Sequence, residues 1–242
     1  MDLLLSINWF AVGQIILIDI LLGGDNAIVI ALACRNLPPS LRRRGILLGA
    51  FGAIAIRVVL IAFAVTLLQV PYLKMLGGAL LFWIGIKLLI DEDDGRAEIH
   101  ASDRLLAAVK TVIVADLVMS FDNVVAVAAA ADHGGGEHRM LLVVFGILIS
   151  IPIIIWGSTV VLKLMERFPV IVTLGAALLG YISGIMATSD VAIQPWIQAN
   201  LLPLEVFLPD SEIHVSLPGL VGAAGVVTIG LFALKRSRRS KV

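Results

Sequence analysis

Apolar stretches about as long as a bilayer is thick recur along the whole chain, and this feature restricts the possible folds more than any other. The 242 residues are 60% hydrophobic and only 15% charged, whereas a soluble domain carries about a quarter charged residues. A segment of about 20 apolar residues crosses hydrocarbon as an α-helix, because a helix satisfies its own backbone hydrogen bonds. We therefore predict an all-α polytopic membrane protein with seven transmembrane helices, at residues 10–34, 45–69, 72–90, 105–131, 140–163, 169–188 and 216–234.

The segments between these helices are short or rich in proline and charge. Residues 189–215 contain Pro195, Pro203, Pro209 and the apolar Trp196, which predicts an external interfacial segment, with a re-entrant path as the alternative. Residues 91–104 form an acidic linker and 235–242 a basic tail. The first apolar stretch has no basic leader and holds several polar residues, so we interpret it as a retained span and not a cleaved signal peptide. All of these segments belong to a single membrane domain.

The basic residues are distributed unevenly between the two sides of the predicted membrane. One side carries only Lys74 and Arg139. The other side carries Arg35, Arg42, Arg43, Arg44, Lys87, Arg96, Arg104, Lys163, Arg167, Lys235, Arg236, Arg238, Arg239 and Lys241. Cytoplasmic loops collect Lys and Arg, so the N-terminus is expected outside and the C-terminus in the cytoplasm of a bacterial inner membrane. We interpret the basic clusters as topology and lipid-surface signals, not as nucleic-acid sites.

The chain repeats a polar pattern at an offset of 97 residues. Asp19, Asp25 and Asn26 recur as Asp116, Asp122 and Asn123. Repeat one covers about 10–90 and repeat two about 105–188, each with three spans, and 216–234 is an additional seventh helix. An odd number of spans inverts the second repeat relative to the first. Inverted three-helix repeats are typical of transporters, which bind their substrate near the bilayer midplane where the repeats meet.

The repeated polar residues predict a cation site within the membrane. On a helix, Asp116, Ser120 and Asn123 lie within about 60° of one another and share a face. Asp25 and Asp122 point elsewhere unless the helix breaks, and Gly23-Gly24 favours such a break in the first span. The predicted metal ligands are therefore Asp19, Asp25, Asn26, Asp116, Ser120, Asp122 and Asn123.

Four membrane carboxylates are costly, at roughly 3 kcal/mol each, unless cations neutralise them. Arg57, at the centre of the second span, is expected to compensate one of them. Carboxylate, amide and hydroxyl oxygens suit Mn²⁺, Ca²⁺ or Mg²⁺, and the single Cys34 leaves no thiolate cluster for a softer metal. We expect a transported divalent cation and no permanent cofactor.

The motif Leu-Gly-Gly-Asp25-Asn26-Ala-Ile-Val-Ile, together with Ser120-Phe-Asp122-Asn123, resembles the short bacterial branch of the TerC family. The resemblance covers the first six spans. It implies a seven-helix fold related to the lysine-exporter superfamily, an association with Mn²⁺ efflux or tellurium resistance, and an ion site at the repeated aspartates and asparagines. The oxygen-rich anionic site favours the cation, so Mn²⁺ efflux is the expected function.

Two other functions are compatible with parts of the sequence. A membrane partner in metal delivery or secretion would not transport at all. An intramembrane aspartyl protease also needs two membrane aspartates, but its Gly-x-Gly-Asp pattern differs here, because Leu22 stands three positions before Asp25. We therefore expect no enzyme. The sequence leaves the oligomeric state and the coupling ion open.

Overall fold

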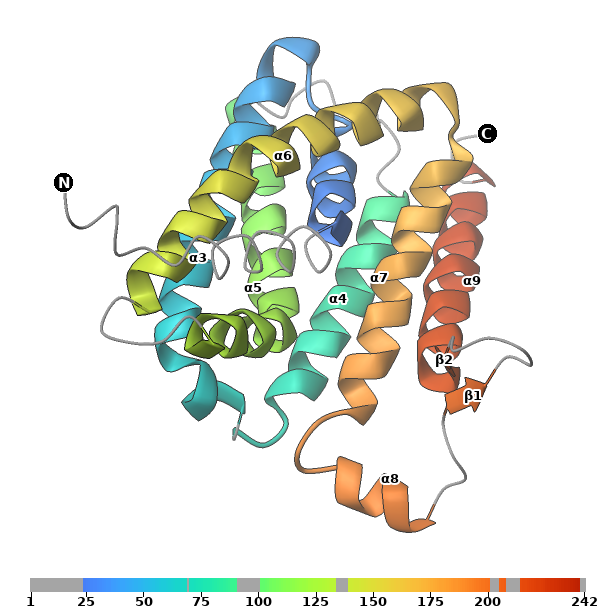
Figure 1. The fold of residues 1–242 in the computed structure, drawn as a ribbon. Coiled ribbons are helices and arrows are strands. Elements are labelled where there is room, and N and C mark those ends of the chain that lie inside the picture. The colour runs from blue at the N-terminus through green and yellow to red at the C-terminus, as the bar shows by residue number, and fades with distance from the viewer. Residues whose placement is uncertain are drawn as a thin grey trace, which may run out of the picture. The chain divides into compact units, whose positions relative to one another are not determined.

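The computed structural model describes residues 24–68, 70–90, 101–133, 139–200, 205–207 and 214–239, and most of them are helical (Figure 1). Within these ranges it describes only the backbone of 61–62, 64–68, 101, 121–133, 139–148, 205–207, 214 and 237–239.

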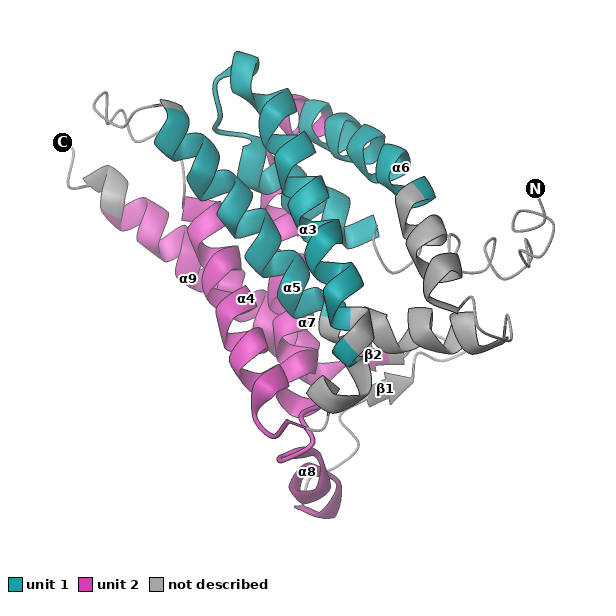
Figure 2. Ribbon diagram, turned by 90° about the vertical axis from the view of Figure 1, so that its left-hand side faces the viewer, with its two compact units in different colours: residues 1–67, 99–163 teal, residues 68–98, 164–242 magenta. Residues whose placement is uncertain are grey.

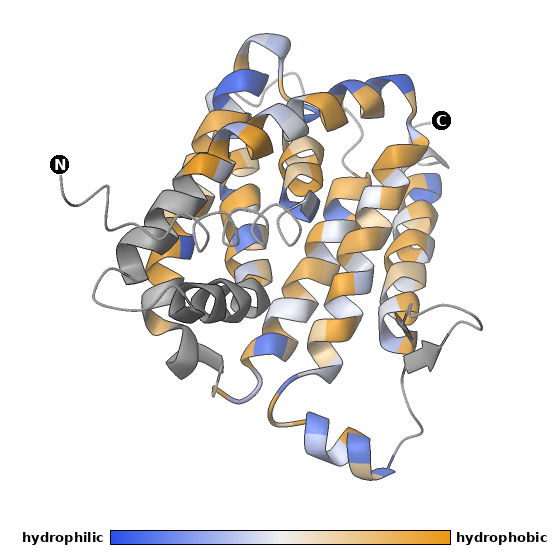
Figure 3. Ribbon diagram, in the orientation of Figure 1, coloured by the Kyte–Doolittle hydropathy of each residue, from blue (hydrophilic) through white to orange (hydrophobic). Residues whose placement is uncertain are grey.

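The described helices follow the predicted spans. They are helix Gly24–Cys34, α3 (Pro39–Leu68), α4 (Leu73–Ile90), α5 (Ala101–His133), α6 (Arg139–Arg167), α7 (Val170–Thr188) and α9 (Leu217–Arg239). Among the described residues, four segments are long and apolar enough to cross a membrane, namely Leu73–Ile90, Ile149–Arg167, Val170–Thr188 and Leu217–Arg236. Apolar residues predominate along α4, α7 and α9 in Figure 3. An α-helical polytopic membrane protein is thereby confirmed, whereas the seven-helix inverted repeat stays a prediction.

The segment predicted to be interfacial contains a short helix and two strands. Helix α8 (Gln194–Asn200) has no buried residue. Strands β1 (Glu205–Phe207) and β2 (His214–Ser216) pair antiparallel with Val206 opposite Val215. This pair departs from the all-α prediction, because Pro203 and Pro209 disfavour helix on either side of β1 and valine favours strand.

The chain divides into two compact units (Figure 2). Unit 1 comprises residues 1–67 and 99–163, and thus the described helix Gly24–Cys34 with α5 and most of α3 and α6. Unit 2 comprises 68–98 and 164–242, and thus α4, α7, α8, α9 and the strand pair.

Small residues bring the helices of unit 2 into backbone contact. A Cβ atom built on Gly180 of α7 would lie only 2.5 Å from the carbonyl oxygen of Gly222 on α9. A Cβ atom on Gly78 of α4 would lie 2.8 Å from the carbonyl oxygen of Ser183 on α7. Such close approach is how membrane helices gain packing energy without a hydrophobic driving force. Helix α7 runs antiparallel to both α4 and α9 (Figure 1).

A buried carboxylate fixes the start of α4. Asp190, just after α7, accepts the backbone N–H groups of Tyr72 (2.9 Å), Lys74 (3.0 Å) and Met75 (3.3 Å). It also accepts the N–H of Ala192 at 2.9 Å. Tyr72 adopts a left-handed φ of 65° to make this turn. Asp190, at the C-terminal end of α7, therefore caps the N-terminus of α4. It accepts the N–H groups that the first turn of a helix leaves without acceptors.

Candidate metal centre

A face of small residues on α3 brings this helix against α5 in unit 1. A Cβ atom on Gly49 would lie 3.0 Å from the Val112 side chain, and one on Gly52 would lie 2.5 Å from Ile113. Gly49, Ala53 and Arg57 are spaced by four residues, so they share one helix face. The close approach at Gly49 therefore directs Arg57 toward α5 about two turns further along.

Arg57, Asp116 and Ser120 form a closed buried network. Only 2% of Arg57 is exposed, and its Nη2 donates to Asp116 Oδ1 in an ion pair. Its Nε donates to Ser120 Oγ at 3.2 Å, and Ser120 Oγ donates to Asp116 Oδ2 at 3.2 Å. Asp116 and Ser120 thus share a face of α5, as their spacing predicted. Both oxygens of the carboxylate are engaged within unit 1.

Asn26 lies next to this network with an unused amide. It is 4% exposed, and neither its Oδ1 nor its Nδ2 has a hydrogen-bond partner in the part of the chain that the structure describes. A buried amide without partners costs about 1–3 kcal/mol, so it calls for an explanation such as a bound water or ion.

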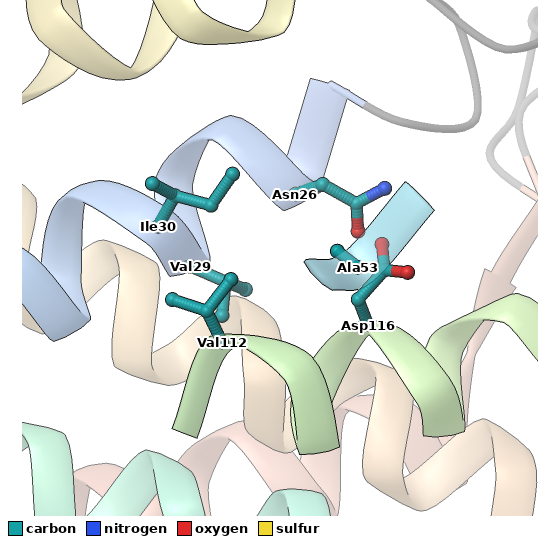
Figure 4. Close-up of a pocket in the computed structure, with 6 residues that line it drawn as sticks. All are labelled: Asn26, Val29, Ile30, Ala53, Val112 and Asp116. Atoms are coloured by element: carbon teal, nitrogen blue, oxygen red, sulfur yellow. The ribbon is translucent and has the colours of Figure 1, made fainter. Parts of the chain in front are cut away.

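A small cavity of about 10 Å³ separates Asn26 from Asp116. Val29, Ile30, Ala53 and Val112 line the rest of it. Figure 4 shows the amide of Asn26 and the carboxylate of Asp116 pointing toward the same space, with Val29, Ile30 and Val112 on the apolar side. A cavity of this volume holds about one water-sized particle.

Asp25 lies beside the cavity and does not line it. Its Oδ1 accepts the backbone N–H of Asn26 at 2.9 Å, a bond that acidic side chains make in first helical turns. Asp25 is half-buried and within electrostatic reach of Arg57 and Asp116. Its charge therefore contributes to the field in which a cation would sit. The predicted helix break at Gly23-Gly24 falls at the edge of the described residues.

The remaining predicted ligands are not placed. Asp19 lies outside the described residues, and Asp122 and Asn123 belong to α5 without described side chains. Among the side chains that the structure does describe, no three His, Cys, Asp or Glu residues gather closely enough to hold a metal. The complete ligand set thus stays a prediction, while Asn26, Asp116, Ser120 and Arg57 are brought together.

Sequence reasoning missed the apolar wall of the cavity. Ala53 could have been found, because it falls midway in the four-residue spacing from Gly49 to Arg57. Val112 could also have been found, since it lies four residues before Asp116 and hence on the same face of α5. Asp190 carried a weaker signal, as an acidic residue just beyond an apolar span.

Comparison with known proteins gives the chain a family. The family described as "Integral membrane protein TerC family" matches residues 5–238. The chain is 44% identical over 173 residues to the uncharacterized membrane protein YjbE of Bacillus subtilis, covering 72% of this chain and 77% of that protein. It is 25% identical over 178 residues to the inner membrane protein YgdQ of Escherichia coli K12, covering 66% and 73% respectively. No solved structure matches significantly. With nearly its whole length matched, the chain belongs to the TerC family of integral membrane proteins.

Proposed function

We propose that this protein is a membrane transporter that exports a divalent cation, Mn²⁺, from the cytoplasm. The observation that carries the proposal is the unpaired, buried amide of Asn26 facing the Asp116 carboxylate across a cavity of about 10 Å³. An ion in this cavity would gain two oxygen ligands and would satisfy the Asn26 carbonyl. Membership of the TerC family and the oxygen-rich motif at Asp25 and Asn26 support the same substrate.

The chemistry of the cavity favours Mn²⁺ among the divalent cations. The polar residues that border it are Asn26 and Asp116, without a histidine or cysteine, and amide and carboxylate oxygens suit Mg²⁺, Ca²⁺ and Mn²⁺. The small volume requires an ion to give up most of its water, which Mg²⁺ does reluctantly. Ca²⁺ takes six to eight oxygen ligands in flexible geometry, so it is the nearest competitor of Mn²⁺.

Purified full-length protein in liposomes tests the proposal directly. Vesicles loaded with a Mn²⁺-sensitive dye should respond to external Mn²⁺ only when they contain the protein. The response should survive a hundredfold excess of Mg²⁺, with Ca²⁺ as the stronger competitor. Displacement of Mn²⁺ by an equal concentration of Mg²⁺ would make Mg²⁺ the better substrate. Binding without flux would instead support a metal-delivery role.

Site variants connect the flux to the cavity. Asn26→Leu removes the amide at similar volume, and Asp25→Asn removes a charge beside it, so each should lower Mn²⁺ flux at least tenfold because the dication loses oxygen or charge stabilisation. Asn200→Leu is the matched control, since Asn200 lies exposed on α8. If Asn26→Leu, at equal reconstitution, shows the same Mn²⁺ flux as the wild type, the cavity is not part of the transport path.

A further inference from the structure

The helices of unit 2 are packed together toward the end where α4 and α9 stop and α7 begins (Figure 1). Leu89 of α4, Ala176 of α7 and Val226 of α9 form a buried apolar cluster there. A Cβ atom built on Gly230 of α9 would lie 2.5 Å from Leu89 Cδ2, so α4 and α9 approach closely. The side chains at this end are therefore displayed on a closely packed three-helix surface.

Exposed cations surround this cluster. Lys87 is exposed in the last turn of α4, Arg167 ends α6 just before α7, and Lys235 and Arg236 are exposed on α9. Glu166 is the one acidic residue among the side chains that the structure describes at this end of unit 2. Such an excess of positive charge attracts an anionic partner.

Two of these cations lie over exposed aromatic rings. Lys87 Nζ is 5.2 Å from the centroid of the Trp83 ring, and Arg167 Cζ is 5.7 Å from that of Phe168. Trp83 is 56% exposed and Phe168 47% exposed. A cation–π contact uses the face of the ring and does not occupy every N–H donor of an ammonium or guanidinium group. The same cation can therefore bind an anion from its other side.

The surroundings of Lys87 favour a lipid over a water-soluble anion. Leu76, Trp83 and Lys87 are spaced by seven and four residues, so they share one face of α4. This face changes from apolar to aromatic to cationic toward the end of the helix. Lysine and tryptophan at such a helix end lie at the level of the lipid headgroups. A phosphate group that carries acyl chains matches this order, whereas inorganic phosphate would contact the cation alone.

We propose that this end of unit 2 binds an anionic phospholipid, whose phosphate contacts Lys87 beside Trp83 and whose acyl chain lies along the same face of α4. Arg167 and the cations of α9 strengthen the attraction, because each basic residue near an anionic headgroup contributes to binding. The inference is independent of the proposed transport of a cation and concerns unit 2 alone.

Quenching of Trp83 fluorescence by brominated lipids tests the proposal in the full-length protein. Phenylalanine replaces Trp9, Trp156 and Trp196, so that Trp83 is the remaining tryptophan. The protein is reconstituted in phosphatidylcholine that contains increasing amounts of brominated phosphatidylglycerol or, in parallel, of brominated phosphatidylcholine. We expect phosphatidylglycerol to bind beside Trp83 about fivefold more tightly than phosphatidylcholine. Equal binding of both lipids, the result expected if the acidic linker 91–104 occupies Lys87, would overturn the proposal.

Charge variants connect the lipid preference to Lys87. Lys87→Gln should reduce the preference to less than twofold, because the cation beside the ring is lost. Lys87→Arg keeps the positive charge and should keep the preference. Lys110→Gln is the matched control, since it removes an exposed lysine of α5 in unit 1, and it should leave the preference unchanged. An equal loss of preference in Lys110→Gln and Lys87→Gln would show a general charge effect and overturn the site.

Thermal unfolding covers the case in which the protein with a single tryptophan does not fold. Phosphatidylglycerol added to the wild type in detergent should raise its unfolding temperature by several degrees more than phosphatidylcholine does. Lys87→Gln should lose most of this difference, whereas Lys87→Arg should keep it. The same stabilisation of Lys87→Gln and wild type would contradict the proposal. Neither measurement involves Mn²⁺, so absence of Mn²⁺ flux would defeat the proposed function and leave the lipid site standing.

Discussion

The buried polar side chains of the described residues differ in how far they are compensated, as Arg57, Asp116, Asp190 and Asn26 show. Arg57 and Asp116 compensate each other between α3 and α5, both predicted to span the membrane. Asp190 is held by four backbone N–H groups. The side-chain amide of Asn26 has no hydrogen-bond partner within the described residues. Full compensation indicates a structural role at Asp190, whereas the unpartnered amide of Asn26 is the group that the proposed cation would satisfy.

Asp190→Asn should destabilise unit 2 by about 2 kcal/mol, because an amide keeps one acceptor oxygen and loses the other. The affected donors are the N–H groups of Lys74 and Met75, or those of Tyr72 and Ala192, depending on the orientation of the amide. Thermal unfolding in detergent measures the change. Asp103→Asn, at an exposed acid in the first turn of α5, is the control and should unfold close to the wild-type temperature.

The destabilisation by Asp190→Asn should depend on pH in a defined direction. Burial opposes ionisation, but the four N–H donors outweigh it and hold the pKa of Asp190 below its usual range. A carboxylate with a lowered folded-state pKa contributes stability above its unfolded pKa of about 3.9 and loses it as the pH falls through the folded value. The difference in unfolding free energy between wild type and variant should therefore be largest at pH 7 and should decrease below about pH 4. A stability difference that stays constant down to pH 3 would contradict the lowered pKa of Asp190.

Single residues could be predicted from the sequence only where helical spacing determines the outcome. The shared face of Asp116 and Ser120 follows from a spacing of four. The choice of Asp116 as the partner of Arg57 depends on how α3 crosses α5, and periodicity within one helix does not specify that crossing. Asp190 caps a helix that begins more than a hundred residues earlier, so no local pattern could reveal the bond.

At the scale of elements, the close contact of α7 with α9 depends on glycine. Gly180→Ala places a methyl group only 2.5 Å from the carbonyl oxygen of Gly222, and the helices must separate to accept it. Overpacking of this kind costs about 1–3 kcal/mol. The variant should unfold several degrees lower in detergent, measured by loss of the monodisperse peak after heating.

Gly157→Ala on α6 is the control for this substitution. Its Cβ would meet Ala27 at 3.6 Å, an ordinary van der Waals distance, so stability should change little. Equal destabilisation by both variants would point to an intrinsic effect of the substitution and not to the contact between α7 and α9.

The ends of the helices show what hydropathy can predict. Spans 72–90 and 169–188 correspond within one residue to α4 and α7. Helices α5 and α6 extend beyond their predicted spans, to Ala101–His133 and Arg139–Arg167, because a helix continues into polar surroundings where apolar residues stop. Strands β1 and β2 contain three residues each, too few for any periodicity to be recognised.

At the scale of the whole molecule, the division into units agrees with the spacing of the proposed repeat. The chain leaves unit 1 after residue 67 and again after residue 163, 96 positions later, close to the sequence offset of 97. Each proposed repeat thus contributes its first two spans to unit 1 and its third span to unit 2. This regularity supports the repeat hypothesis, which a solved structure would test.

The orientation of the chain follows from where unit 2 places its charges. Helices α4 and α9 end on the side where α7 begins (Figure 1), because α7 is antiparallel to both. Lys87, Lys235 and Arg236 therefore gather at one end, and Lys74 with α8 lies at the other. By the excess of basic residues in cytoplasmic segments, the end with α8 should face outward.

Cysteine labelling of intact and permeabilised cells measures this orientation. In a Cys34→Ala background, Gln198→Cys on the exposed face of α8 should react with a membrane-impermeant maleimide in intact cells. Ser240→Cys in the basic tail should react only after the membrane is permeabilised, which also shows that both thiols are reactive. Labelling of Ser240→Cys alone in intact cells would show that the chain has the opposite orientation. The positively charged ends of α4 and α9 would then face outward against the usual distribution of charge, and the proposed direction of Mn²⁺ export would have to be argued from transport measurements alone.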